Sequence, residues 1–95
     1  MTQAAHTPGP WHVGDRNALL GTYIRDANGF CVAITNTPNN QRAYYIDEAA
    51  NARLISAAPD MLAALVKVEK VLRDEGFPQT LRQVQNAISK ATGAS

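Results

Sequence analysis

Asp47-Glu-Ala-Ala-Asn-Ala-Arg-Leu-Ile-Ser-Ala-Ala-Pro-Asp-Met-Leu-Ala-Ala-Leu65 is the stretch that governs the C-terminal half of this chain. It is rich in alanine and leucine, which favour helix. Pro59 lies inside it, however, and a proline lacks the backbone N–H and clashes with the preceding turn. Because proline is well accepted at the first position of a helix, we expect a break at Ala58-Pro59, with helices over residues 47–57 and 59–74.

The expected first helix has a start signal and an apolar stripe. Asp47 is the predicted N-cap, because a carboxylate at that position accepts hydrogen bonds from the end N–H groups. Helical spacing predicts a buried stripe that consists of Ala50, Leu54, Ile55 and Ala58. Arg53 points away from this stripe, so it is a candidate for contact with a partner.

The expected second helix has more apolar surface than one neighbouring helix requires. Its main stripe, at helical spacing, consists of Met61, Leu65, Val68 and Leu72. Leu62 and Val66 widen this stripe. Surplus apolar surface marks an interface when it is left exposed, so the sequence predicts a homodimer or a higher oligomer.

A third helix is expected over residues 80–92. Gly76 is a natural C-cap for the helix before it, since glycine adopts the left-handed conformation without strain. Thr80 and Gln83 have the spacing of a capping box, which favours a helix start at Thr80. The connection is short, so the last two helices should be antiparallel neighbours.

The N-terminal half alternates in the manner of short strands. Asp26-Ala-Asn-Gly29 has the residue types of a tight turn, with a positive φ expected at Gly29, and it predicts a β-hairpin over residues 23–35. The expected strands cover residues 11–13, 19–25 and 30–35, with a turn at residues 14–17 between the first two. In the third strand, large side chains share one face through Phe30, Val32 and Ile34.

These patterns together predict an α+β fold. A small antiparallel sheet of three or four strands should be followed by three C-terminal helices in a single domain over residues 1–95. Residues 1–8 are expected to form a flexible arm, and residues 43–46 either add an edge strand or lead into the first helix.

Composition narrows the class of protein. With a formal net charge of +1, the chain has no general field that would attract nucleic acid, which argues against bulk nucleic-acid binding. It has no signal peptide and no apolar run long enough to cross a bilayer, so we expect a cytoplasmic protein with no membrane contact. The single cysteine, Cys31, excludes an intrachain disulfide and is expected to be buried in a strand.

The sequence contains no recognisable catalytic constellation. His6 and His12 lie near the start, and one cysteine does not complete a zinc site with them. The glycines follow no phosphate-binding pattern, and the serines lack a nucleophile-elbow context. We therefore expect no enzymatic activity, no metal and no cofactor.

Candidate binding residues lie between the expected sheet and the first helix. Arg42, Tyr44 and Tyr45 are close together in sequence, and Arg25 can approach them across the sheet. Arginine beside aromatic rings can stack on a base and hold a phosphate. In the alternative interpretation the tyrosines cover the core between helix and sheet. Trp11, beside two prolines, is either an exposed aromatic anchor or a lid over one end of the core.

Three segments of the chain carry a family resemblance. Thr7-Pro-Gly-Pro-Trp11, Asn51-Ala-Arg-Leu-Ile55 and Ala57-Ala-Pro-Asp-Met-Leu-Ala-Ala-Leu65 resemble the signature of a family of small proteins from tailed phages and prophages. The resemblance implies a phage or prophage origin and does not imply any enzymatic reaction. We expect a non-enzymatic accessory protein that binds a host component, with inhibition of a host defence system as one use.

Two other functions remain open at this point. An oligomer could hold a small nucleotide signal at its subunit interfaces with Arg and Tyr side chains. A nucleic-acid-associated regulator is the other alternative. We expect function to depend on Arg53 or on the segment from Arg42 to Tyr45, and not on His12 or Cys31.

Overall fold

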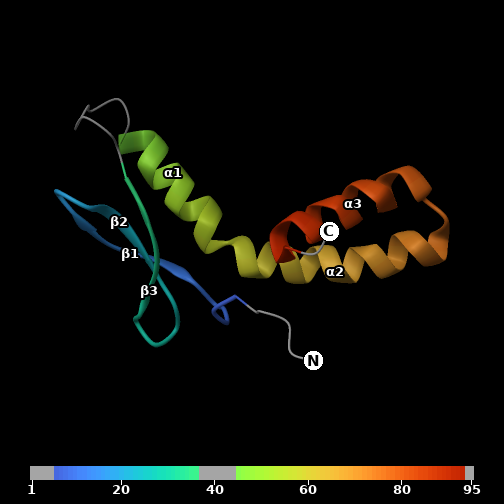
Figure 1. The fold of residues 1–95 in the computed structure, drawn as a ribbon, viewed down its shortest axis with the longest axis horizontal. Helices are drawn as coiled ribbons and strands as arrows, with labels where there is room; N and C mark the ends of the chain where they lie inside the picture. The colour runs from blue at the N-terminus through green and yellow to red at the C-terminus, as the bar shows by residue number, and fades with distance from the viewer. Residues whose placement is uncertain (1–5, 37–44, 94–95) are drawn as a thin grey trace. The chain divides into compact units, whose positions relative to one another are not determined.

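The computed structural model describes residues 6–36 and 45–93, and the chain divides into two compact units. The first unit covers residues 7–59 and contains the sheet and the first helix (Figure 1). The second unit contains the helices from Asp60 onward. The fold is α+β, as the sequence predicts, with three strands followed by three helices in the described residues.

The sheet is antiparallel, with β2 (Gly21–Arg25) between β1 (His12–Asn17) and β3 (Cys31–Thr35). The turn that joins β2 to β3 confirms the predicted hairpin. Asp26 Oδ1 accepts hydrogen bonds from the N–H groups of Asn28 and Phe30, both at 2.9 Å. Gly29 has a φ of 86°, which a residue with a Cβ rarely adopts.

The predicted turn at residues 14–17 is wrong, because this segment belongs to β1. A shift of register between Val13 and Arg16 places Gly14 and Asp15 opposite the single residue Tyr23, as in a β-bulge with one extra residue. The chain turns instead at residues 18–20, where Asn17 Oδ1 accepts from the N–H groups of Leu19 and Leu20 at 2.8 and 3.0 Å. An asparagine that caps the backbone in this way stabilises a turn without a glycine in it.

Helix α1 (Tyr45–Ser56) packs against one face of the sheet and contacts all three strands (Figure 1). Ala52 and Ile24 are both fully buried in this unit, since a methyl side chain lets the helix approach the sheet closely. The predicted stripe of the first helix is wrong at Leu54, which is 60% exposed, and at Ala50 and Ala58, which are both exposed. The helix begins at Tyr45, so Asp47 lies in its first turn and is not the N-cap.

Large side chains that the sequence pattern groups on one face of the sheet are exposed in the structure. Ile34 is paired with Tyr23 and lies on the face that α1 does not cover, but a shift of register between Ile24 and Arg25 pairs Cys31 with Arg25, so simple alternation does not extend to Phe30. Phe30 is 70% exposed and Ile34 is 42% exposed. Cys31 is also exposed, so its predicted burial is wrong. The reason is that period-two alternation tells which residues share a face, and not which face a helix will cover.

The predicted break between the first two helices is confirmed. Helix α1 ends at Ser56, Ala57 is in a turn, and helix α2 (Ala58–Glu75) begins at the next residue. Pro59 is then the second residue of α2, where its missing N–H costs no helical hydrogen bond.

Helices α2 and α3 (Pro78–Thr92) form a helical hairpin in the second unit (Figure 1). Gly76 has a φ of 82°, and the N–H groups of Gly76 and Phe77 both donate to the carbonyl of Leu72 at 3.0 Å. These bonds confirm Gly76 as the C-terminal cap of α2. The predicted capping box is wrong, because α3 starts at Pro78 after an N-cap residue, Phe77, that makes no side-chain cap bond.

Candidate functional site

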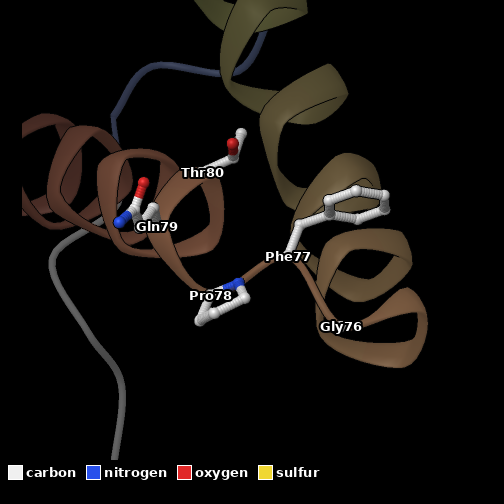
Figure 2. A pocket seen from close by; sticks show the side chains of 5 residues that line it. All are labelled: Gly76, Phe77, Pro78, Gln79 and Thr80. Carbon is white, nitrogen blue, oxygen red and sulfur yellow. The ribbon is translucent and has the colours of Figure 1, made fainter.

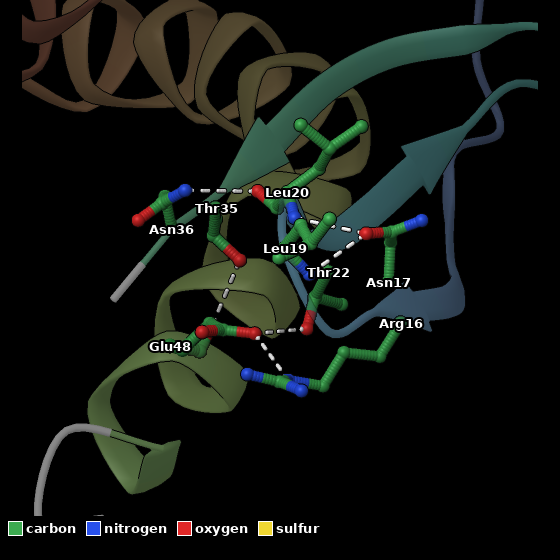
Figure 3. A network of polar contacts seen from close by, with 8 residues as sticks. All are labelled: Arg16, Asn17, Leu19, Leu20, Thr22, Thr35, Asn36 and Glu48. Carbon is green, nitrogen blue, oxygen red and sulfur yellow. Dashed lines mark hydrogen bonds and ion pairs between the residues drawn. The ribbon is translucent and has the colours of Figure 1, made fainter. Parts of the chain in front are cut away.

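A buried carboxylate fixes α1 against the sheet (Figure 3). Glu48 is 2% exposed, and its Oε1 accepts hydrogen bonds from Thr22 Oγ1 at 2.7 Å and from Arg16 Nε at 2.9 Å. Its backbone carbonyl accepts from Thr35 Oγ1 at 3.1 Å. One residue of α1 is thereby joined to all three strands, since Arg16, Thr22 and Thr35 come from β1, β2 and β3.

This cluster has a structural role. A buried charge is tolerated when it is paired and hydrogen-bonded, and Glu48 meets both conditions. Among the described residues, no buried side-chain nitrogen or oxygen lacks a hydrogen-bond partner. Glu48 and Arg16 are not among the candidate residues predicted from the sequence. The available signal was the spacing of Glu48, Ala52 and Ile55 along one side of the helix.

A second set of polar contacts fastens the β1–β2 turn to the end of β3 (Figure 3). Asn36 Nδ2 donates to the carbonyl of Leu20 at 3.0 Å, next to the bonds that Asn17 makes to this turn. Gly21, which follows the turn, has a φ of 113°, and a Cβ there would overlap the carbonyl oxygen of Thr35. The turn is therefore held close to β3, and its two leucines remain exposed.

The sheet face opposite α1 carries an arginine that is fixed in place. Arg25 Nε lies 3.2 Å from Asp15 Oδ1, and Nη1 donates to the carbonyl of Gly29 at 2.9 Å. The guanidinium carbon lies 4.8 Å from the centre of the Tyr23 ring, within the range of a cation–π contact. Gly14 leaves room for Arg25, since a Cβ there would meet its side chain at 3.3 Å.

Apolar side chains continue this face across the hairpin. Tyr23 is paired directly with Ile34 in the antiparallel register, so the two side chains share a face. We call this surface the open sheet face and define it by five residues: Asp15, Tyr23, Arg25, Val32 and Ile34. Within the unit of residues 7–59, no described helix lies on it. It combines an ordered arginine, an aromatic ring and exposed apolar area, which are the components of many binding sites.

The structure brings together only some of the candidate residues from the sequence. Arg25 lies on the open sheet face, and Trp11 directly precedes His12, the residue paired with Arg25 in β1. The Trp11 ring is half-buried, and its Nε1 donates to the carbonyl of Thr7 at 3.1 Å. Arg53 is exposed on α1, which covers the other face, so it does not converge with Arg25.

The remaining candidates cannot be placed in this way. Arg42 and Tyr44 lie outside the described residues. Tyr45 is the first residue of α1, and its side chain is likewise outside what the structure describes. Asp15 and Tyr23 are members of the site that were not predicted from the sequence. Their contacts with Arg25 depend on the strand register, and the available signal was that Tyr23 and Arg25 alternate onto one face.

A hollow at the α2–α3 connection carries no comparable set of groups (Figure 2). Its lining residues are Gly76, Phe77, Pro78, Gln79 and Thr80. None of them is charged, and the hollow is an open depression beside the start of α3. It offers no arrangement that would select a ligand.

In residues 6–36 and 45–93, no three His, Cys, Asp or Glu side chains are grouped so that they could hold a metal ion. None of the helices in these ranges has the length and apolar character needed to cross a bilayer.

Comparison with protein families places the chain among phage proteins. The family described as Salmonella phage P22 protein Y8K6 matches the chain over residues 1–95. No curated protein and no solved structure matches the chain. The family match agrees with the resemblance to phage proteins noted in the sequence.

Proposed function

Because the chain belongs to the Salmonella phage P22 protein Y8K6 family, we propose that it is a non-enzymatic phage accessory protein that binds a protein of the host cytoplasm through the open sheet face. The observation that carries this proposal is the arginine of that face, Arg25, which is stacked over Tyr23 and held by Asp15. Inhibition of a host defence protein is the use that we propose for this binding.

An arginine that is ordered before binding is well suited to a protein interface. Association costs free energy when a long side chain must be immobilised, and contacts within one chain remove part of that cost. Arg25 makes three such contacts, to Tyr23, Asp15 and Gly29. Arginine and tyrosine are also the residues that most often dominate interface energies. Ile34, which is paired with Tyr23, adds apolar area beside them.

The charges on this face favour a protein over a small anion. Asp15 lies 3.2 Å from Arg25 and offsets its charge, so the pair exerts little attraction on a phosphate. A nucleotide sponge and a nucleic-acid regulator both need uncompensated cations at the binding surface. We therefore propose neither of these two functions, and the experiment below includes a result that would support each of them.

Affinity capture with matched variants tests this function. Tagged wild-type protein, Tyr23→Ala and Arg25→Ala would be used to capture proteins from host lysate, and the captured protein would then be purified and rebound. Loss of a central Tyr or Arg contact should lower the affinity at least about tenfold. Lys90→Ala, an exposed cation of α3, is the matched control and should bind as the wild type does. Circular dichroism would confirm that each variant is folded.

Other results would redirect or refute the proposal. Equal capture by wild type, Tyr23→Ala and Arg25→Ala would refute the open sheet face as the site. Loss of capture in Arg53→Ala alone would move the site to the exposed surface of α1. A nucleotide released by heating the purified protein would support the sponge. Retardation of DNA with a steep salt dependence would support the nucleic-acid regulator.

A further inference from the structure

The chain contains one Asn-Gly dipeptide, and it lies at the tip of the β2–β3 hairpin. Asn28 is the only asparagine of the sequence that a glycine follows. Both residues are exposed, and a Cβ built at Gly29 would meet no atom within 4 Å. Because glycine has no side chain, its backbone nitrogen can be approached more closely than that of other residues. The surroundings therefore leave room for the Asn28 side chain to reach the nitrogen of Gly29.

The carboxamide of Asn28 is not held by the protein. Among the residues that the structure describes, it has no hydrogen-bond partner, and only the backbone N–H of Asn28 is bonded, to Asp26 Oδ1. Asn17 and Asn36 differ, since their carboxamides bond to the backbone of the β1–β2 turn. The Asn28 carboxamide is therefore free to rotate towards the next residue.

We propose that Asn28 is a site of spontaneous deamidation, in which its side chain cyclises onto the Gly29 nitrogen and water opens the ring. The Gly29 nitrogen, after loss of its proton, attacks Cγ of Asn28. A bond forms between these two atoms, the Cγ–Nδ2 bond breaks, and the nitrogen of the carboxamide takes up a proton and leaves as ammonia. Water then hydrolyses the cyclic imide at one of its two carbonyls. The product is aspartate or isoaspartate in place of Asn28.

The native turn slows this reaction without preventing it. The Gly29 N–H donates to the carbonyl of Asp26 at 3.0 Å, and this bond must break before the nitrogen can attack. Residues 27–30 are all exposed, so opening of the tip uncovers no core. Segments with few buried contacts open locally at a low cost in free energy. The folded protein is therefore expected to react measurably, but more slowly than the denatured chain.

The isoaspartate product changes the hairpin tip and releases one contact of Arg25. In that product the main chain runs through Cβ and Cγ of residue 28, which lengthens the turn by a carbon atom. The bonds that close the turn, from the N–H groups of Gly29 and Phe30 to Asp26, depend on the normal length of this segment. The carbonyl of Gly29 also accepts from Arg25 Nη1 at 2.9 Å. Conversion of Asn28 therefore loosens the hairpin tip and the arginine of the open sheet face together.

Peptide mapping by mass spectrometry tests the proposal on purified protein kept in mildly alkaline buffer. Asn28 is expected to gain the mass of an amide-to-acid conversion, with isoaspartate as well as aspartate among the products. Asn86, which is exposed in α3 and followed by alanine, is the internal control and should stay intact. In concentrated urea Asn28 should convert about tenfold or more faster, because the bonds that close the turn are then absent.

Asn28→Gln is the matched variant. It keeps the carboxamide, but its longer side chain must close a larger ring, which forms far more slowly, so no measurable conversion is expected at this position. The change at the hairpin tip is read from the NMR spectrum of isotope-labelled protein. Signals of the Phe30 N–H and the Arg25 Nε–H should shift as the wild type converts and stay fixed in Asn28→Gln. Signals of α3 should stay fixed in both proteins.

Four results would overturn the proposal. The first is an intact Asn28 in the native protein after the denatured chain has converted, and the second is equal conversion of Asn28 and Asn86. The third is aspartate without isoaspartate, since direct hydrolysis of the side chain gives aspartate alone. The fourth is a converted protein in which the Phe30 and Arg25 signals have not shifted. None of these measurements uses a host protein, so they are independent of the proposed function.

Discussion

Gly29 and Gly21 both adopt a positive φ, but the atoms around the two residues differ. Both have a positive φ, but a Cβ at Gly29 meets no atom within 4 Å, and a Cβ at Gly21 would overlap the carbonyl of Thr35. Gly29→Ala should therefore cost about 1 kcal/mol in free energy of unfolding, from the backbone alone. Gly21→Ala should cost roughly 2 kcal/mol or more, because β3 must also move. Urea denaturation measures both, and an alanine variant at Gly29 as stable as the wild type would contradict the turn assignment.

Glu48 is expected to be the polar residue whose loss destabilises the sheet unit most. Glu48→Ala leaves the hydroxyl of Thr22 and the Nε of Arg16 without this acceptor, and should cost about 2–3 kcal/mol, since Arg16 can still reach water. Thr35→Val removes one neutral bond and should cost about 1 kcal/mol. Glu75→Ala, at the exposed end of α2, is the control and should change stability by less than about 0.5 kcal/mol. A Glu48→Ala variant no less stable than Glu75→Ala would show that the cluster contributes nothing.

At the scale of one element, the side chain that α1 buries against the sheet is that of an alanine. Ala52 is fully buried against the sheet, and Ala50 on the same helix is exposed. Ala52→Leu should cost about 1–3 kcal/mol because the helix must move away from the sheet. Ala50→Leu should change stability by less than about 0.5 kcal/mol. Thermal unfolding of the two variants checks the order, and equal values would mean that α1 does not approach the sheet at Ala52.

At the scale of the whole molecule, stability should depend on protein concentration. If α2 pairs with a second copy, the dimer is the state that unfolds, and mass action raises its Tm as the protein is concentrated. A rise of several degrees is expected for the wild type between about 5 and 500 µM. The Tm of Val68→Glu should stay constant over this range. A constant Tm for the wild type would contradict self-association.

The sequence by itself determined the features whose causes are local. The turn at residues 26–29 follows from an Asp that caps it and a Gly with positive φ. Pro59 separates α1 from α2, and Gly76 ends α2, because each residue restricts or frees the backbone at its own position. These signals were enough to predict the α+β order of three strands and three helices. They also gave Arg25 as a binding candidate, from its residue type and its expected place in the sheet.

Only the tertiary structure decided which surfaces became core and which remained open. Because β1 contains a bulge, the turn after β1 lies several residues later than the sequence pattern predicts. The pairing of β1 with β2 also places Asp15 beside Arg25. The choice of face for α1 buried Glu48 and left Cys31 and Ile34 exposed. Sequence periodicity shows which residues share one face of a strand or one stripe of a helix. Which of them is covered depends on the fit between segments far apart in the chain, and no local pattern contains that information.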